Sequence, residues 1–70
     1  METIINETAE KIISYDWDTA KNNCPDNPSM NLRFLPIAKH GKKAMQKAVE
    51  IASESMGVEL ELKGQEVFIA

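Results

Sequence analysis

Cys24 and His40 are the side chains of this 70-residue chain with the chemistry of a nucleophile and a general base. Nucleophilic catalysis needs such a pair within hydrogen-bond reach, with a third group that orients the base. Cys24 is followed by Pro25 in a loop-like stretch, and no basic neighbour in sequence would activate its thiol. His40 lies near the start of a predicted helix, between its apolar and polar sides. We therefore expect no catalytic residue and no enzyme activity.

Metal and cofactor sites are predicted to be absent as well. One histidine and one cysteine are too few for a structural zinc site. The run from Asp16 to Asp18 is similar to the start of a calcium loop, but Lys21 and Asn27 stand where that loop needs glycine and glutamate. The two glycine-rich phosphate-binding motifs, GxxxxGK(S/T) and GxGxxG, do not occur in the sequence. We expect neither a metal nor a cofactor.

A cluster of lysines is the first charged feature. Nine residues without an acid contain Lys39, Lys42, Lys43 and Lys47, whereas the other 61 residues carry eleven acids and four bases. The start of a helix disfavours cations, and a docked anion would be bound by backbone N–H groups as well as by lysines. The cluster, with Arg33, thus predicts an anion or nucleic-acid contact. The alternative is a solvated helix face whose lysines pair with acids.

An aromatic residue among acids is the second feature. If the last strand alternates, Phe68 points away from the core, and its surroundings are Glu59, Glu61 and Glu66. Arg33 or Leu35 from a preceding strand would share this face. A phenylalanine inside a polar rim resembles a binding hot spot, which predicts a protein partner. The alternatives are that the 22–31 loop covers Phe68 or that a homodimer buries it.

These side chains would be positioned by a helix predicted from Ile37 to Met56, around which the chain is organised. Apolar and small residues recur there at steps of three and four, which is the pattern of an amphipathic helix. The stripe consists of Ile37, Gly41, Ala44, Ala48, Ile51, Ala52 and Ser55. Because most of these residues are small, we expect a sheet to pack closely against them.

An earlier helix is predicted from residue 3 to about residue 15, with a kink or restart near Asp16. Trp17, the only tryptophan, is expected in the core. Prolines and asparagines predict a loop over 22–31, and Leu32–Leu35 reads as a short strand that a following proline ends.

The C-terminal part predicts a β-hairpin. Gly57 ends the long helix, and the apolar residues after it alternate with charged ones. A turn at Gly64-Gln65 sets the register. The expected pairs are Leu62 with Val67, Leu60 with Ile69 and Glu61 with Phe68.

The fold class that follows is α+β, in one compact domain over residues 1–70, with the order helix, strand, helix, strand, strand. Both helices would cover one face of a three-stranded sheet, and the final strand would lie between the other two.

Composition and charge favour a cytoplasmic location. The net charge is −3, and the single cysteine rules out a disulfide within the chain. The acidic first residues do not resemble a signal peptide, and no apolar run is long enough to span a membrane.

The order of elements from Leu32 to Ala70, preceded by a helix, resembles the small single-strand-binding domain named for its Arg-x-x-x-His motif. Lys42 and Gln46 stand at about the positions of that arginine and histidine, and the predicted helix is about a turn longer. The resemblance implies a similar topology and adds weight to nucleic-acid binding, but it identifies no site residue.

The expected function is that of a non-enzymatic protein-binding module. It would be a small cytosolic accessory or inhibitor protein, of the kind found on mobile elements, that occupies a surface of a larger partner through the Phe68 face. The alternative is a nucleic-acid-binding domain that uses the lysine-rich start of the central helix.

Overall fold

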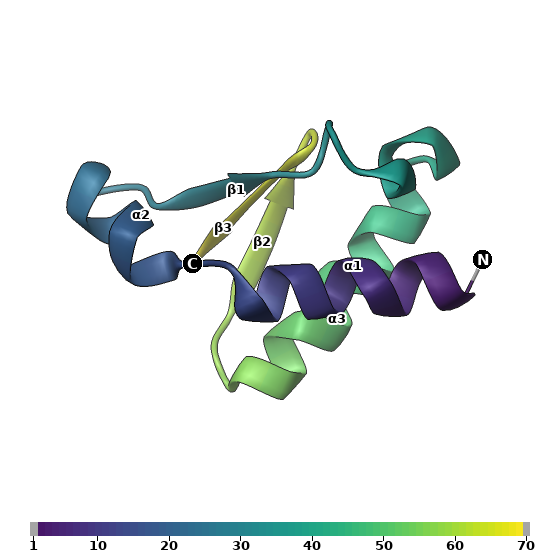
Figure 1. Cartoon of the computed structure of the whole chain (residues 1–70), viewed down its shortest axis with the longest axis horizontal. Helices are drawn as coiled ribbons and strands as arrows, with labels where there is room; N and C mark the ends of the chain where they lie inside the picture. The colour runs from purple at the N-terminus through teal and green to yellow at the C-terminus, as the bar shows by residue number, and fades with distance from the viewer. Residues whose placement is uncertain (1, 70) are drawn as a thin grey trace.

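The computed structural model describes residues 2–69, and it has the α+β architecture that the sequence predicts (Figure 1). The helices are α1 (Glu2–Ser14), α2 (Trp17–Asn23) and α3 (Lys42–Met56), with a 3₁₀ helix, η1 (Pro36–His40), directly before α3. The strands are β1 (Ser29–Asn31), β2 (Leu60–Lys63) and β3 (Glu66–Ile69).

The three strands form one antiparallel sheet in the order β1-β3-β2, so the last strand lies in the middle as predicted. The hairpin register is confirmed at all three expected pairs, with Leu62 opposite Val67, Leu60 opposite Ile69 and Glu61 opposite Phe68. On the other side of β3, Met30 pairs with Val67. Because β1 and β2 are both antiparallel to β3, they run parallel to each other.

The turn of the hairpin depends on one glycine. Gly64 has a positive φ of 62°, whereas no residue other than glycine has a positive φ among the described residues. Gln65 therefore has a negative φ, which is the pattern of a two-residue turn with glycine at its first central position. This turn determines which strand residues face the core.

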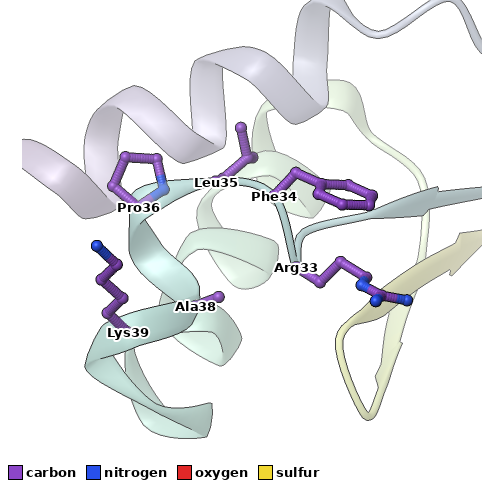
Figure 2. A pocket seen from close by; sticks show the side chains of 6 residues that line it. All are labelled: Arg33, Phe34, Leu35, Pro36, Ala38 and Lys39. Atoms are coloured by element: carbon purple, nitrogen blue, oxygen red, sulfur yellow. The ribbon is translucent and has the colours of Figure 1, made fainter.

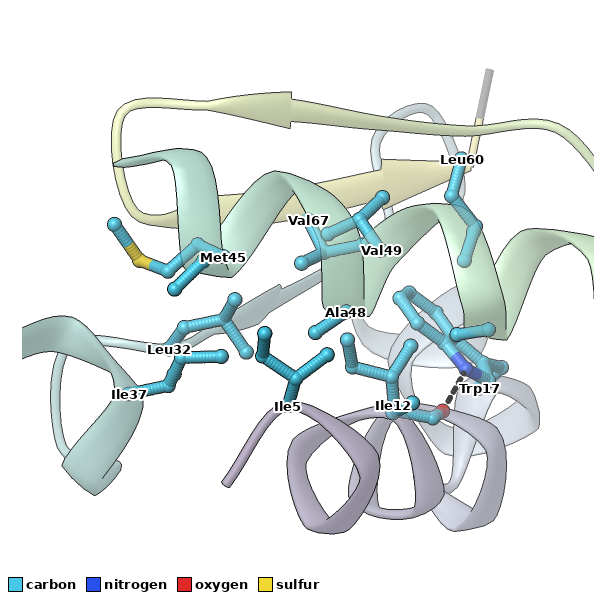
Figure 3. Close-up of a cluster of buried hydrophobic side chains, with 13 residues drawn as sticks. Ile5, Ile12, Trp17, Leu32, Ile37, Met45, Ala48, Val49, Leu60 and Val67 are labelled. Atoms are coloured by element: carbon cyan, nitrogen blue, oxygen red, sulfur yellow. Dashed lines mark hydrogen bonds between the residues drawn. The ribbon is translucent and has the colours of Figure 1, made fainter. Parts of the chain in front are cut away.

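The core lies where α1, α3 and one face of the sheet meet (Figure 3). Helix α1 packs mainly along α3, which also contacts β2. Close packing of the two helices follows from the small residues Ala9, Ala44, Ala48 and Ala52, all of which are buried. The largest fully buried side chains are Ile12, Leu32, Ile37, Val49 and Val67.

The predicted continuous helix over 37–56 is wrong at one point. Gly41, with φ 91° and ψ 177°, separates η1 from α3, so the α-helix begins only at Lys42. This backbone conformation is essentially restricted to glycine. Within α3 itself, the buried stripe also differs from the predicted one. Ile51 is 42% exposed instead of buried, while Met45 and Val49 take its place in the core.

The predicted strand over 32–35 is also wrong, because the strand that pairs with β3 is Ser29–Asn31. Residues 32–35 form a turn in which the Leu35 N–H donates to the Leu32 carbonyl at 3.0 Å. The Asn31 side chain accepts a hydrogen bond from the Arg33 N–H at 2.9 Å. An asparagine side chain that mimics a backbone turn in this way competes with strand pairing.

The restart near Asp16 is confirmed. Helix α1 ends at Ser14, and Asp16 caps α2 by accepting a hydrogen bond from the Thr19 N–H. Trp17 is in the core, as predicted, with 8% of its surface exposed.

Candidate binding surface

The turn over residues 32–35 presents two side chains, Arg33 and Phe34, to solvent. They occupy the two central positions of the turn, between Leu32, which is fully buried, and Leu35, which is half-buried. The Leu32 N–H donates to the Gln65 carbonyl at 2.7 Å, which ties the turn to the hairpin. Anchors on both sides hold these residues in a defined conformation.

Phe34 is the most exposed large hydrophobic residue among residues 2–69, with 82% of its surface accessible. Single exposed apolar residues are common on protein surfaces. Phe34 differs from such isolated residues in two ways: hydrogen bonds fix the turn that carries it, and the charged residues at its hollow, Arg33 and Lys39, are cationic. No periodicity in the sequence singles it out, because the run Leu-Arg-Phe-Leu reads as a strand. The local signal was Asn31, which starts the turn.

A shallow hollow of about 330 Å³ lies beside Phe34 (Figure 2). Its floor is apolar and consists of Leu35, Pro36 and Ala38. Arg33 and Lys39 stand at opposite ends of the hollow. The Arg33 guanidinium carbon lies over the Phe34 ring, 5.1 Å from its centroid, which is a cation–π contact. We call the hollow with its two flanking cations the Phe34 site.

The segment of the chain that contains the Phe34 site has no acidic residue. Residues 27–49 contain five of the eight basic residues and no aspartate or glutamate. Within the described part of the chain, the only ion pair within 4.0 Å joins Lys63 to Glu61, so none of these five cations is neutralised by a contacting carboxylate. The acidic net charge of the protein thus comes entirely from other segments.

The structure places one of the four predicted lysines, Lys39, at the Phe34 site and the others along α3. Lys42 and Lys43 lie in the first turn of α3, and all four lysines are exposed. His40, Lys43 and Lys47 line a second hollow together with Ile5. Lys47 also borders a hollow that contains Glu2 and Glu50, so it lies where basic and acidic surfaces meet.

The outer face of the sheet differs from the expectation in one respect. Phe68 lies on that face, opposite Glu61 and Ser29, but it is half-buried. The Lys63 ammonium covers the ring at 5.6 Å from its centroid and is paired with Glu61. Glu59, Glu61 and Glu66 are exposed, as expected. Their contact with a partner remains a prediction.

Arg33 or Leu35 was expected to share the face of Phe68, and the structure places both residues after β1, at the Phe34 site. Arg33 follows β1 rather than lying within it, and its side chain belongs to the Phe34 site. The side chain of Leu35 lines the same hollow. The two sets of residues named from sequence, acids around Phe68 and cations around the lysine cluster, therefore form separate surfaces.

The two residues considered for catalysis, Cys24 and His40, lie in different parts of the fold, after α2 and at the end of η1. Cys24 is exposed and follows α2 as its C-terminal cap, while the hollow lined by His40 contains lysines and apolar residues. No group of three or more histidine, cysteine, aspartate or glutamate residues within 2–69 is placed to hold a metal ion. No helix in this range is long and apolar enough to cross a membrane.

Comparison with known proteins identifies no family for this chain. No protein-family model matches the chain, and neither the curated proteins nor the solved structures give a significant match. The resemblance to the single-strand-binding domain therefore remains one of element order.

Proposed function

We propose that this chain is a non-enzymatic module that binds a nucleic acid through its basic surface. The observation that carries the proposal is the Phe34 site, where a phenylalanine that is 82% exposed lies beside a hollow flanked by two cations, Arg33 and Lys39. A positively charged surface with an accessible aromatic ring has the two components that sequence-independent nucleic-acid binding requires.

Two features of the exposed surface support nucleic-acid binding over the protein-binding interpretation. The protein-binding interpretation was built on an exposed Phe68 among acids, and that ring is half-buried under Lys63. The nucleic-acid interpretation is based on the lysines and Arg33, and Phe34 lies at the same hollow as Lys39 and Arg33. The most exposed aromatic residue thus has two cations, Arg33 and Lys39, at its site, which favours an anionic partner.

The test is the binding of a fluorescein-labelled, mixed-sequence, single-stranded 20-mer, as DNA and as RNA, followed by fluorescence anisotropy at low salt. Lys39→Glu and Lys43→Glu should each weaken binding, because each places a carboxylate against phosphates. Lys21→Glu is the matched control. It makes the same charge change in α2, which Figure 1 shows at the end of the molecule opposite η1, and should leave affinity nearly unchanged.

An absence of binding by the wild-type protein at low salt would refute the proposal. Equal losses for Lys21→Glu and Lys39→Glu would also count against it, because the effect would then reflect net charge rather than a surface.

Protein binding is the second candidate, and the same ring favours it. Aromatic residues and arginine are enriched at interface hot spots, and Phe34 and Arg33 are such a pair. In this case the chain would be an accessory or inhibitor protein that occupies a surface of a larger partner. A photo-crosslinker at residue 34 would then trap a protein that survives nuclease treatment, whereas one at residue 68 would trap it only if the sheet face takes part. Light scattering on the purified protein would reveal the homodimer alternative.

We place this module in the cytoplasm. The support is chemical: Cys24 is exposed and has no disulfide partner, and a reducing compartment keeps such a thiol unmodified.

A further inference from the structure

We infer that the Phe34 site takes one unpaired nucleobase, stacked on the open face of Phe34, with the flanking phosphates bound by Arg33 and Lys39. The inference rests on the proposed function and names its ligand class: single-stranded nucleic acid, bound without base-specific hydrogen bonds. It concerns what the ring does, beyond the attraction of phosphates to a basic surface.

The geometry of the ring supports stacking. Arg33 lies over the ring at 5.1 Å, and the residue is still 82% exposed, so the greater part of the ring remains open. A base on the open face would complete a stack of base, phenyl ring and guanidinium. Base–aromatic stacking tolerates any sequence because every base has a π-face.

The hollow beside the ring brings a second cation, Lys39, into the site. Its floor of Leu35, Pro36 and Ala38 is apolar, and Lys39 stands across it from Arg33 (Figure 2). The phosphates on the two sides of a stacked base would therefore each have a cation near them. Lys43 lies beyond η1, in the first turn of α3, and offers a further phosphate contact to a strand that continues in that direction.

The arrangement selects unpaired bases. In a duplex the faces of the bases are covered by their neighbours in the stack, so an aromatic side chain reaches a base only after it is unstacked. Phosphates, by contrast, are accessible in single and double strands alike. A preference for single strands that depends on Phe34 is thus the signature of this inference.

The experiment compares three fluorescein-labelled probes of equal length: dT12, an abasic 12-mer with the same phosphates, and a 12-base-pair duplex. Each is titrated with the wild-type protein, with Phe34→Ala and with Phe68→Ala, which makes the same change on the outer face of the sheet. Because Phe34 is exposed, its replacement should leave folding intact, which circular dichroism verifies.

We expect Phe34→Ala to weaken binding of dT12 by roughly 5- to 150-fold, the range of one lost stacking contact. The abasic probe should bind the wild-type protein about as weakly as dT12 binds Phe34→Ala, and the same substitution should not weaken it further. Phe68→Ala should bind dT12 like the wild-type protein.

Failure of the inference and failure of the proposed function give different results. If the wild-type protein binds dT12 and the abasic probe equally well, and Phe34→Ala changes neither, stacking is refuted while nucleic-acid binding stands. If no probe binds the wild-type protein at low salt, the proposed function itself falls, and protein docking at Phe34 becomes the function to pursue.

Discussion

Trp17 and Tyr15 join the first two helices to the sheet through polar atoms as well as packing. The Trp17 indole N–H donates to the Ile12 carbonyl at 2.9 Å, and the two rings meet edge to face at 4.8 Å. The Tyr15 hydroxyl donates to the Ser29 carbonyl at 3.0 Å. A buried aromatic residue with a satisfied polar group contributes both apolar area and orientation.

Trp17→Phe tests this role. The change keeps an aromatic ring but removes the N–H and leaves a small void, so it should lower the free energy of unfolding by about 1–3 kcal/mol. Urea denaturation measures the effect. Tyr15→Phe is the control and should cost less, about 0.5–1.5 kcal/mol, since it removes one partly buried hydrogen bond. Wild-type stability for Trp17→Phe would show that the indole hydrogen bond contributes nothing.

Asp16 predicts a pH dependence. Hydrogen bonds from the Thr19 hydroxyl, at 2.6 Å, and then from the Thr19 N–H lower the pKa of Asp16 below its usual 3.8. Its stabilising effect is therefore fully present above that pH and is lost as the pH falls through the lower, folded-state pKa. Asp16→Asn can still accept at the cap but does not titrate. The difference in stability between the two proteins should shrink in acid, as denaturant midpoints at several pH values would show. A difference that does not vary with pH would contradict this assignment.

At the level of elements, the break between η1 and α3 determines where the residues of η1 that line the Phe34 site lie. Gly41 allows the chain to leave η1 and enter α3 at an angle that one continuous helix would not permit. Ile37 is thereby fully buried, while Lys39 is exposed beside the hollow. The position of the binding surface thus depends on one backbone conformation outside every regular element.

Gly41→Ala should destabilise the protein by about 1–3 kcal/mol, since φ 91° with ψ 177° is strained for any residue with a Cβ. No atom lies within 4 Å of an added Cβ, so the cost would come from the backbone and not from a clash. Thermal or urea unfolding measures it. Gly57→Asn is the control, because asparagine tolerates the left-handed conformation of Gly57, at φ 69° and ψ 25°. Equal, small effects of both changes would argue against a break that is specific to Gly41.

At the scale of the whole molecule, charge is segregated. Residues 27–49 carry a formal charge of +5 and the remaining residues −8, which together give the net −3. Figure 1 shows α2, which lies outside the basic segment, far from η1. An acidic protein can therefore present a local basic surface, because contacts between exposed charges are screened beyond about 10 Å at ordinary salt.

Salt dependence tests this picture. If Arg33, Lys39, Lys42 and Lys43 each neutralise one phosphate, the slope of log K against log salt concentration should be about −3 for a single strand, at about 0.7 per phosphate. Anisotropy titrations of dT12 across a salt series measure the slope. Lys39→Gln should reduce its magnitude by about 0.7, while Lys21→Gln should leave it unchanged. A slope near zero would indicate that binding is not electrostatic.

The parts of the fold that follow from sequence are those with short-range causes. The hairpin register could be counted because a two-residue turn at Gly64 and strict alternation leave one pairing that puts Leu60, Leu62 and Val67 on the same face of the sheet. Gly57 ended α3 where a left-handed residue is required. The exposure of the lysine cluster could also be predicted, because lysine side chains are rarely buried without a charged partner.

The tertiary structure decided which segment pairs with β3, and with it the candidate site. Residues 29–31 and 32–35 are both short and partly apolar, so local propensity does not choose between them. Pairing of Met30 with Val67 uses the edge of β3, and Asn31 then turns the chain. That choice buries Leu32, exposes Phe34 beside Arg33 and moves Arg33 away from Phe68. Whether an aromatic ring is buried depends on which side chains pack against it. Phe68 is covered in part by Lys63 from the neighbouring strand, whereas Phe34 stays exposed because the turn over 32–35 does not pair with the sheet.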